Sequence, residues 1–148
     1  MLELDNVDLN TDTMAAWFVK NEVVRVEFAL TDDRMMSREG ENRYVVGDAL
    51  IAGSTGDKWS VSQNRFHGKY DPLPPTQRGE PGKYQAKPIP VLAKQVPVPF
   101  TVARSAGGDL LRGGADDWLL QYAPGDYGIV ECARFEQVYR RHQSQCRD

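Results

Sequence analysis

The sequence has no long apolar run, and it has only two cysteines and two histidines among its 148 residues. No window approaches the roughly 18 apolar residues that a membrane-spanning helix needs. The first residues, Met1 to Asp5, are acidic and show neither the basic region nor the apolar core of a secretory signal. We therefore expect a cytoplasmic protein that has no membrane as a partner.

The few cysteines and histidines give little material for a metal site or a nucleophile. Cys132 and Cys146 are spaced neither as a zinc ligand pair nor as a C-x-x-C redox motif, and we expect two reduced thiols. His67 and His142 have no His, Cys or acidic neighbour at metal-ligand spacing. The chain also lacks a Gly-x-Ser-x-Gly elbow and a phosphate-binding loop that ends in Lys-Ser or Lys-Thr. We expect no metal, no cofactor and no catalytic residue.

The composition is that of a folded chain made of short elements. Hydrophobic residues make up 41% and charged residues 26%, which excludes a disordered protein. Nine prolines and thirteen glycines predict many turns and few long helices.

Charge is unevenly spread along the chain. Residues 1–57 hold 5 Lys and Arg against 12 Asp and Glu, a net of −7, whereas residues 58–94 hold 7 against 2, a net of +5. The basic stretch either neutralises the acidic third across a packed interface or a dimer contact, or it attracts an anionic partner such as a nucleic acid. We favour the first interpretation, because a chain with a net charge of −3 is a poor general nucleic-acid binder.

Four landmarks recur in the same order in the two halves of the chain. Residues 24–30 and 96–102 both read Val-x-Val-x-Phe-x-aliphatic, the alternation of a half-buried strand. The other landmarks are an apolar pair before glycine (Met35-Met36 and Leu110-Leu111), a Gly-Asp pair (Gly47-Asp48 and Gly125-Asp126) and Arg-Phe-x-x-x-Tyr (from Arg65 and from Arg134). The order predicts two tandem, diverged copies of one module. We place the first copy at 1–70, a Pro/Gly-rich linker at 71–83 and the second copy at 84–148.

The local patterns predict a strand-rich α+β protein. Strands are expected near 23–30, 43–46, 49–53 and 58–61 in the first half, and near 88–94, 97–104, 118–122 and 127–131 in the second. Helices are expected at 13–20, 62–70 and 132–143. Glycines at 53–56 predict a hairpin in the first copy that the second copy has lost. Each module is then a small β-sheet or barrel-like unit that is closed by a short helix.

The segment Pro124-Gly125-Asp126-Tyr127-Gly128 is the sharpest local motif. Proline followed by glycine predicts a type II turn in which Gly125 has a positive φ. Tyr127 is then expected to enter a strand, and Gly128 to allow a neighbouring element to approach closely. With these residues the chain resembles the PGDYG family, which is named for this motif. The resemblance implies a fold unit, and it brings no activity, substrate or catalytic residue to this chain.

We predict a non-catalytic cytoplasmic binding or interaction protein, with any ligand in the cleft between the two modules. The candidate ligand-binding residues are Asp48, Lys94, Gly125, Asp126 and Tyr127. One alternative is a small enzyme that uses Asp126 or Asp48 with Tyr127. A second alternative is nucleic-acid binding through the basic stretch 58–94. A homodimer is also possible through proline-rich edge strands.

Overall fold

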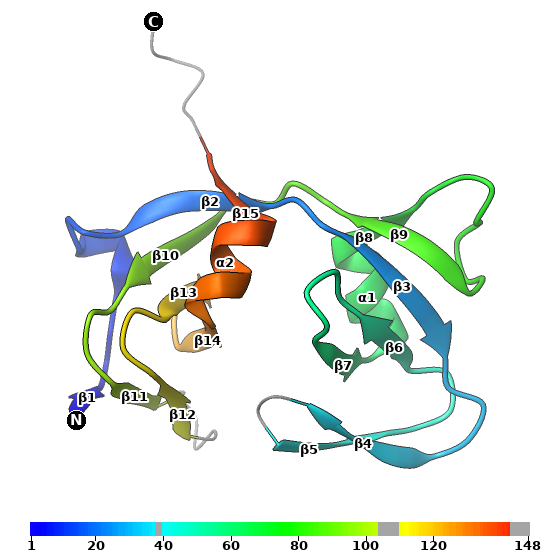
Figure 1. Ribbon diagram of the computed structural model, residues 1–148, viewed down its shortest axis with the longest axis horizontal. Coiled ribbons are helices and arrows are strands. Elements are labelled where there is room, and N and C mark those ends of the chain that lie inside the picture. Colours follow the sequence, from blue (N-terminus) through cyan, green and yellow to red (C-terminus); the bar gives the residue numbers. More distant parts are fainter. Residues whose placement is uncertain (38–39, 104–109, 143–148) are drawn as a thin grey trace, which may run out of the picture. The chain divides into compact units, whose positions relative to one another are not determined.

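A computed structural model of the chain describes residues 1–37, 40–103 and 110–142 (Figure 1). The chain forms two compact units: unit 1 is Met1–Val19 with Pro90–Asp148, and unit 2 is Lys20–Ile89. Strands dominate both units, and the described residues contain two short α-helices. The strand-rich α+β class is therefore confirmed. Cys146 lies outside the described residues.

Unit 2 is built on a five-stranded sheet of order β7-β6-β3-β9-β8. The strands are β3 (Val23–Phe28), β6 (Ala49–Ala52), β7 (Lys58–Val61), β8 (Tyr70–Pro72) and β9 (Gly82–Ala86). All of its strand pairs are antiparallel. Helix α1 (Gln63–Lys69) begins at Ser62, whose hydroxyl oxygen accepts a hydrogen bond from the backbone N–H of Arg65 at 3.4 Å.

One face of this sheet forms the core of unit 2 against α1. Side chains alternate between the two faces of a strand, so every second residue of β3 and β6 is buried here. The core comprises Val24, Val26, Ala49, Ile51, Phe66, Tyr70, Tyr84 and Ala86. A separate hairpin of β4 (Asp33–Ser37) and β5 (Gly40–Tyr44) completes the unit.

Unit 1 has a five-stranded sheet of order β14-β13-β10-β2-β15. Its strands are β2 (Ala16–Lys20), β10 (Val91–Gln95), β13 (Trp118–Ala123), β14 (Asp126–Val130) and β15 (Tyr139–Arg141). Helix α2 (Cys132–Val138) contributes Phe135 to a core with Val91, Ala93 and Leu120. Figure 1 shows each helix next to the sheet of its own unit.

Unit 1 also has a second core, which has no counterpart among the described residues of unit 2. A three-stranded sheet of order β1-β11-β12 joins β1 (Leu2–Leu4), β11 (Phe100–Ala103) and β12 (Leu110–Gly113). Together with the 3₁₀ turn η1 (Leu9–Thr11) it contributes to a buried cluster that also takes residues from the five-stranded sheet. The cluster comprises Leu9, Leu92, Val96, Phe100, Val102, Leu119 and Tyr127.

Several local predictions are confirmed, and one helix is wrong. The strand at 58–61, the strand that begins at Val23 and the helix after Ser62 lie where the pattern predicts them. The predicted helix at 13–20 is instead strand β2, which lies between β10 and β15. Its Ala-Trp-Phe-Val run favours a strand once two neighbouring strands are available, and that tertiary pairing outweighs the local signal. The helix predicted to reach residue 143 ends at Val138, and Tyr139 begins β15.

Three predictions about the modules are also wrong. No sheet of the described residues closes into a barrel. The second half has not lost its hairpin, because β13 and β14 form one around the Pro124-Gly125 turn. Gly47-Asp48 does not correspond to Gly125-Asp126, since the first pair precedes β6 and the second lies at a hairpin turn.

The proline-rich segments occupy connections. The prolines at 88, 90, 97 and 99 were expected to restrict their strands to sheet edges or to demand bulges. They lie outside the strands, and β10 and β11 are interior strands of their sheets. The predicted linker 71–83 connects β8 to β9 inside unit 2, where the two strands pair. The compact units thus divide the chain differently from the predicted modules 1–70 and 84–148.

No helix of the described residues combines the length and the apolar character that crossing a membrane requires.

Candidate functional site

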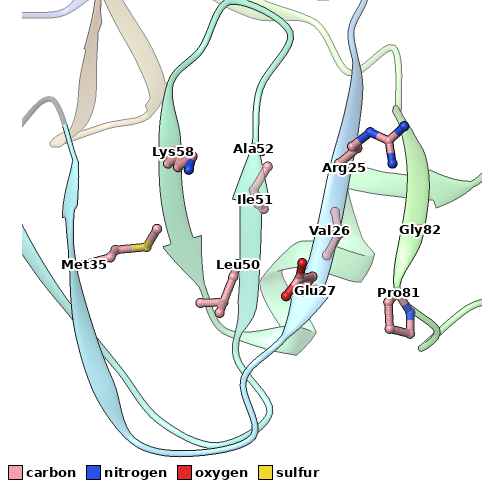
Figure 2. Close-up of a pocket in the computed structure, with 10 residues that line it drawn as sticks. All are labelled: Arg25, Val26, Glu27, Met35, Leu50, Ile51, Ala52, Lys58, Pro81 and Gly82. Carbon is pink, nitrogen blue, oxygen red and sulfur yellow. The ribbon is translucent and has the colours of Figure 1, made fainter.

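A cavity of about 500 Å³ lies on the face of the unit 2 sheet that is opposite α1. Its lining comes from β3, β6, β7, β9 and β4, and comprises Arg25, Val26, Glu27, Met35, Leu50, Ile51, Ala52, Lys58, Pro81 and Gly82. Figure 2 shows Met35 extending from β4 toward the sheet, so the β4–β5 hairpin forms one wall. The volume is in the range of small-molecule sites.

The strand register places three cations in one row across this face. Arg25 of β3 lies opposite Lys83 of β9 on one side and opposite Ala52 of β6 on the other. Ala52 in turn lies opposite Lys58 of β7. Two strand spacings separate Arg25 from Lys58, which is about 10 Å between Cα atoms. The small Ala52 side chain lies between the two cations and leaves space above the sheet.

The parallel row of paired residues, two positions further along β3, brings apolar surface and one acidic residue to the pocket. Glu27 lies opposite Leu50, and Leu50 lies opposite Ser60. Leu50 and Met35 are half-buried and bring apolar surface to the cavity. The pocket therefore combines charged and apolar contacts within one volume.

The three cations of this row are exposed to solvent and form no ion pair with a described residue. Within residues 1–37, 40–103 and 110–142, Arg25, Lys58 and Lys83 have no side-chain hydrogen bond and no carboxylate within ion-pair distance. Figure 2 shows the Arg25 side chain extending toward β9. Their charges are thus available to a ligand.

The PGDYG segment forms a tight turn, as its sequence predicts. Pro124 and Gly125 connect β13 to β14, and Gly125 has a φ of 79°. A shift of register between Gln121 and Ala123 marks a bulge just before the turn. A family model described as PGDYG protein matches residues 40–140, which is more than half of the chain.

The chain belongs to the PGDYG protein family. No curated protein and no solved structure matches it. The match runs from β5 to β15, so this family member carries the family pattern in parts of both units.

The motif residues Asp126, Tyr127 and Gly128 of this PGDYG protein pack or pair with other residues of unit 1. Tyr127 is 3% exposed, belongs to the second core and donates a hydrogen bond from its hydroxyl to the carbonyl oxygen of Val7. A Cβ atom on Gly128 would lie 2.8 Å from the hydroxyl oxygen of Tyr122, so the predicted close approach is present. Asp126 is the first residue of β14 and lies opposite Ala123.

The other two predicted ligand-binding residues also have partners. Asp48 accepts a hydrogen bond from the backbone N–H of Val45 at 3.1 Å and belongs to unit 2. Lys94 of unit 1 lies 2.7 Å from the Asp12 carboxylate, and this hydrogen bond lowers the pKa of Asp12. The cavity lining contains none of the five predicted residues.

Cys132 and His67 both have pKa values shifted from their ordinary ranges. Cys132 has a raised pKa, because burial and then the nearby Glu136 carboxylate oppose its thiolate. Burial lowers the pKa of His67, and its Nδ1 has no partner in the described structure. Among the described residues, no group of three or more His, Cys, Asp or Glu side chains is placed to hold a metal ion.

The cations of the basic stretch 58–94 lie in different surroundings: Lys58 and Lys83 belong to the row with Arg25, whereas two others have acidic partners. Lys87 lies 3.7 Å from Asp71, and Lys94 pairs with Asp12. Trp59 is partly buried against the core of unit 2.

Sequence reasoning missed the cavity residues. The alternation in β3 was a sufficient signal that Arg25 and Glu27 face away from the core. It could not show which residues of β6, β7 and β9 stand beside them, because register depends on pairing in the fold.

Proposed function

We propose that this family member is a non-catalytic small-molecule-binding protein made of two diverged copies of one module. One copy keeps an open ligand pocket on its sheet, and the other has filled the same face with a hydrophobic core. The observation that carries the proposal is this contrast between two sheets of equivalent topology.

The order of elements supports the duplication. The first copy runs β2, β3, the β4–β5 hairpin, the β6–β7 hairpin, α1 and β8. The second copy runs β9, β10, the β11–β12 hairpin, the β13–β14 hairpin, α2 and β15 in the same order. The two five-stranded sheets, β7-β6-β3-β9-β8 and β14-β13-β10-β2-β15, follow one arrangement when these elements are matched.

Local hydrogen bonding agrees with an offset of 69 residues between the copies. Asp48 accepts from the backbone N–H of Val45 at 3.1 Å, and Asp117 accepts from that of Gly114 at 2.9 Å. Each Asp directly precedes the first strand of its hairpin. The same offset matches Gly56 with Gly125, and both have a positive φ.

The cores match by position as well. Each side chain of the unit 1 core that contains Phe135 of α2 has a counterpart in the unit 2 core that packs against α1. Residues of the sheets are matched by strand register, and the others by their position in the helix and in the strand that follows it. The pairs are Val91 with Val24, Ala93 with Val26, Trp118 with Ala49, Leu120 with Ile51, Val130 with Val61, Phe135 with Phe66, Tyr139 with Tyr70 and Phe18 with Tyr84.

In this alignment the two copies exchange their first strands. β2 begins the first copy, but it pairs with β10 in the sheet of unit 1. β9 begins the second copy, but it pairs with β3 in the sheet of unit 2. The exchange accounts for the discontinuous unit 1.

The two copies differ on the outer face of the sheet. In unit 1, Leu92, Leu119 and Tyr127 on this face are 6%, 1% and 3% exposed, because the second core covers them. Their counterparts in unit 2 are Arg25, Leu50 and Lys58, which line the cavity. Loss of the covering core in one copy and gain of charge on the same face favour a binding role for unit 2.

The test is a thermal-shift screen of the full chain against uncharged, cationic and anionic small molecules. Binding to the folded state raises the unfolding temperature by mass action. Ala52→Trp fills the cavity and should abolish the shift that a true ligand causes. Leu30→Trp adds the same ring at a position that is 89% exposed and outside the cavity, and should leave the shift intact. Hits that persist in Ala52→Trp, or no hit in any class, would refute the proposal.

A further inference from the structure

We infer that the ligand of the unit 2 pocket is a small organic anion, with a phosphate or carboxylate group held by Arg25 and Lys58 and an apolar part on Leu50 and Met35. This inference rests on the proposed function, and it adds the chemical class of the ligand.

The charge arrangement is unfavourable without an anion. Arg25 and Lys83 lie directly opposite each other on adjacent strands, and like charges in this position repel. Lys58 continues the same row beyond Ala52. The cavity lining holds one acid, Glu27, against two cations, Arg25 and Lys58. An anion placed above Ala52 would offset the repulsion along the row.

The matching row in unit 1 shows that the fold itself does not need cations there. The residues at these four positions are Trp17, Leu92, Gln121 and Tyr127, and none is charged. The cationic row thus occurs only where the face is open. The sheet forms with uncharged side chains at the equivalent positions of unit 1, so the three cations of unit 2 are not required to form it.

The geometry suits a single anionic group. Arginine binds phosphate and carboxylate oxygens through two parallel N–H groups, and lysine adds a point charge. The exposed Arg25 side chain extends toward β9 in Figure 2. Exposed side chains change rotamer within picoseconds to nanoseconds, so Arg25 can turn toward Ala52 when an anion arrives.

The apolar part of the pocket limits the rest of the ligand. Leu50 and Met35 offer a floor and a wall, and Pro81 lies at the β9 end. A cavity of about 500 Å³ accommodates a ring or a short chain beside the anionic group. Inorganic phosphate alone should therefore bind more weakly than an aryl phosphate.

The experiment uses four probes that share a benzene ring: phenyl phosphate, benzoate, benzyl alcohol and benzylamine. Affinities are measured by isothermal titration calorimetry on the full chain at low salt, and inorganic phosphate serves as a fifth probe. We expect phenyl phosphate or benzoate to bind, with a loss of about tenfold or more in Arg25→Gln and in Lys58→Gln. Which of the two anions binds more tightly distinguishes a phosphate ligand from a carboxylate ligand.

Arg65→Gln is the matched control, because it removes the same charge from an exposed position on α1. It should leave the affinity unchanged. If benzyl alcohol or benzylamine binds as tightly as the anions, and Ala52→Trp abolishes that binding, the anion inference is wrong while the proposed function stands. If no probe and no compound of the wider screen binds in a manner that Ala52→Trp abolishes, the proposed function fails and the inference fails with it.

Discussion

Gly113 shows how closely one residue of β12 fits its neighbour. A Cβ atom at this position would overlap the ring of Phe100, which is 0% exposed. The ring lies in the second core and cannot move aside without disturbing its packing. The requirement for glycine at Gly113 therefore comes from tertiary contact.

We predict that Gly113→Ala lowers the free energy of unfolding by about 1–3 kcal/mol, the usual effect of overpacking a core. Gly114→Ala is the control, because its added Cβ would meet only the Asp117 carboxylate at an ordinary 3.5 Å. Urea unfolding followed by circular dichroism measures both. Equal stability of the two variants would contradict the prediction.

His67 is a second residue whose environment gives a measurable effect. Its imidazole is buried and packs near the rings of Phe28, Phe66 and Tyr84. Burial, followed by the charges of Arg78 and Lys87, lowers its pKa below the ordinary 6.5.

Because the folded state resists protonation of His67, its contribution to stability is complete above pH 6.5 and decreases as the pH falls below that value. We predict that His67→Phe weakens the loss of stability on acidification. Urea midpoints of both proteins between about pH 8 and about pH 5 measure the difference, since other titrating groups affect both alike. Parallel midpoints across this range would show that His67 does not contribute.

At the scale of elements, the sequence predicted turns best and the pairing of strands least well. Pro124 and Gly125 defined a turn from the sequence, because proline fixes φ and glycine alone adopts a positive φ easily. The segment 13–20 was predicted to be a helix but contains β2, since its partners β10 and β15 lie more than 70 residues later in the chain. A local pattern cannot contain that information.

The hairpin turn gives a prediction at this scale. Gly125 has a φ of 79°, so Gly125→Ala should cost about 1–2 kcal/mol of stability through backbone strain. Gly68→Ala is the comparison, because Gly68 lies in α1 with open space around it and should be neutral or stabilising. Chemical denaturation of both variants provides the measurement, and a neutral Gly125→Ala would argue against a strained turn.

At the scale of the whole molecule, two short connections join strands of one unit's sheet to strands of the other. β2 of the unit 1 sheet continues after two residues into β3, the middle strand of the unit 2 sheet. β9 of unit 2 leads through residues 87–90 into β10, the middle strand of unit 1. If either sheet unfolds, it frees a strand that is joined by a short connection to the middle strand of the other sheet. Unfolding of one sheet should therefore destabilise the other.

We predict a single cooperative unfolding transition, although the two units have separate cores. Ile51→Ala in unit 2 and Leu120→Ala in unit 1 each remove a buried side chain, with an expected cost of about 2–5 kcal/mol. Both variants should lower the same transition in scanning calorimetry, with equal calorimetric and van't Hoff enthalpies. Two transitions, of which each variant moves only one, would show that the units unfold independently.

The sequence by itself determined the elements whose causes are local. Alternation set the strands at 23–28 and 58–61, the serine cap set the start of α1, and proline with glycine set the PGDYG turn. Membership of the PGDYG family also follows from sequence alone.

Only the tertiary structure decided which strands are neighbours. Backbone hydrogen bonds in a sheet are the same for every residue type, so the choice of partner depends on how whole faces pack. That choice placed β2 beside β10, and it aligned Arg25, Ala52 and Lys58 in one row. It also buried Tyr127 of the motif, whereas the sequence suggested a ligand-binding role for this residue.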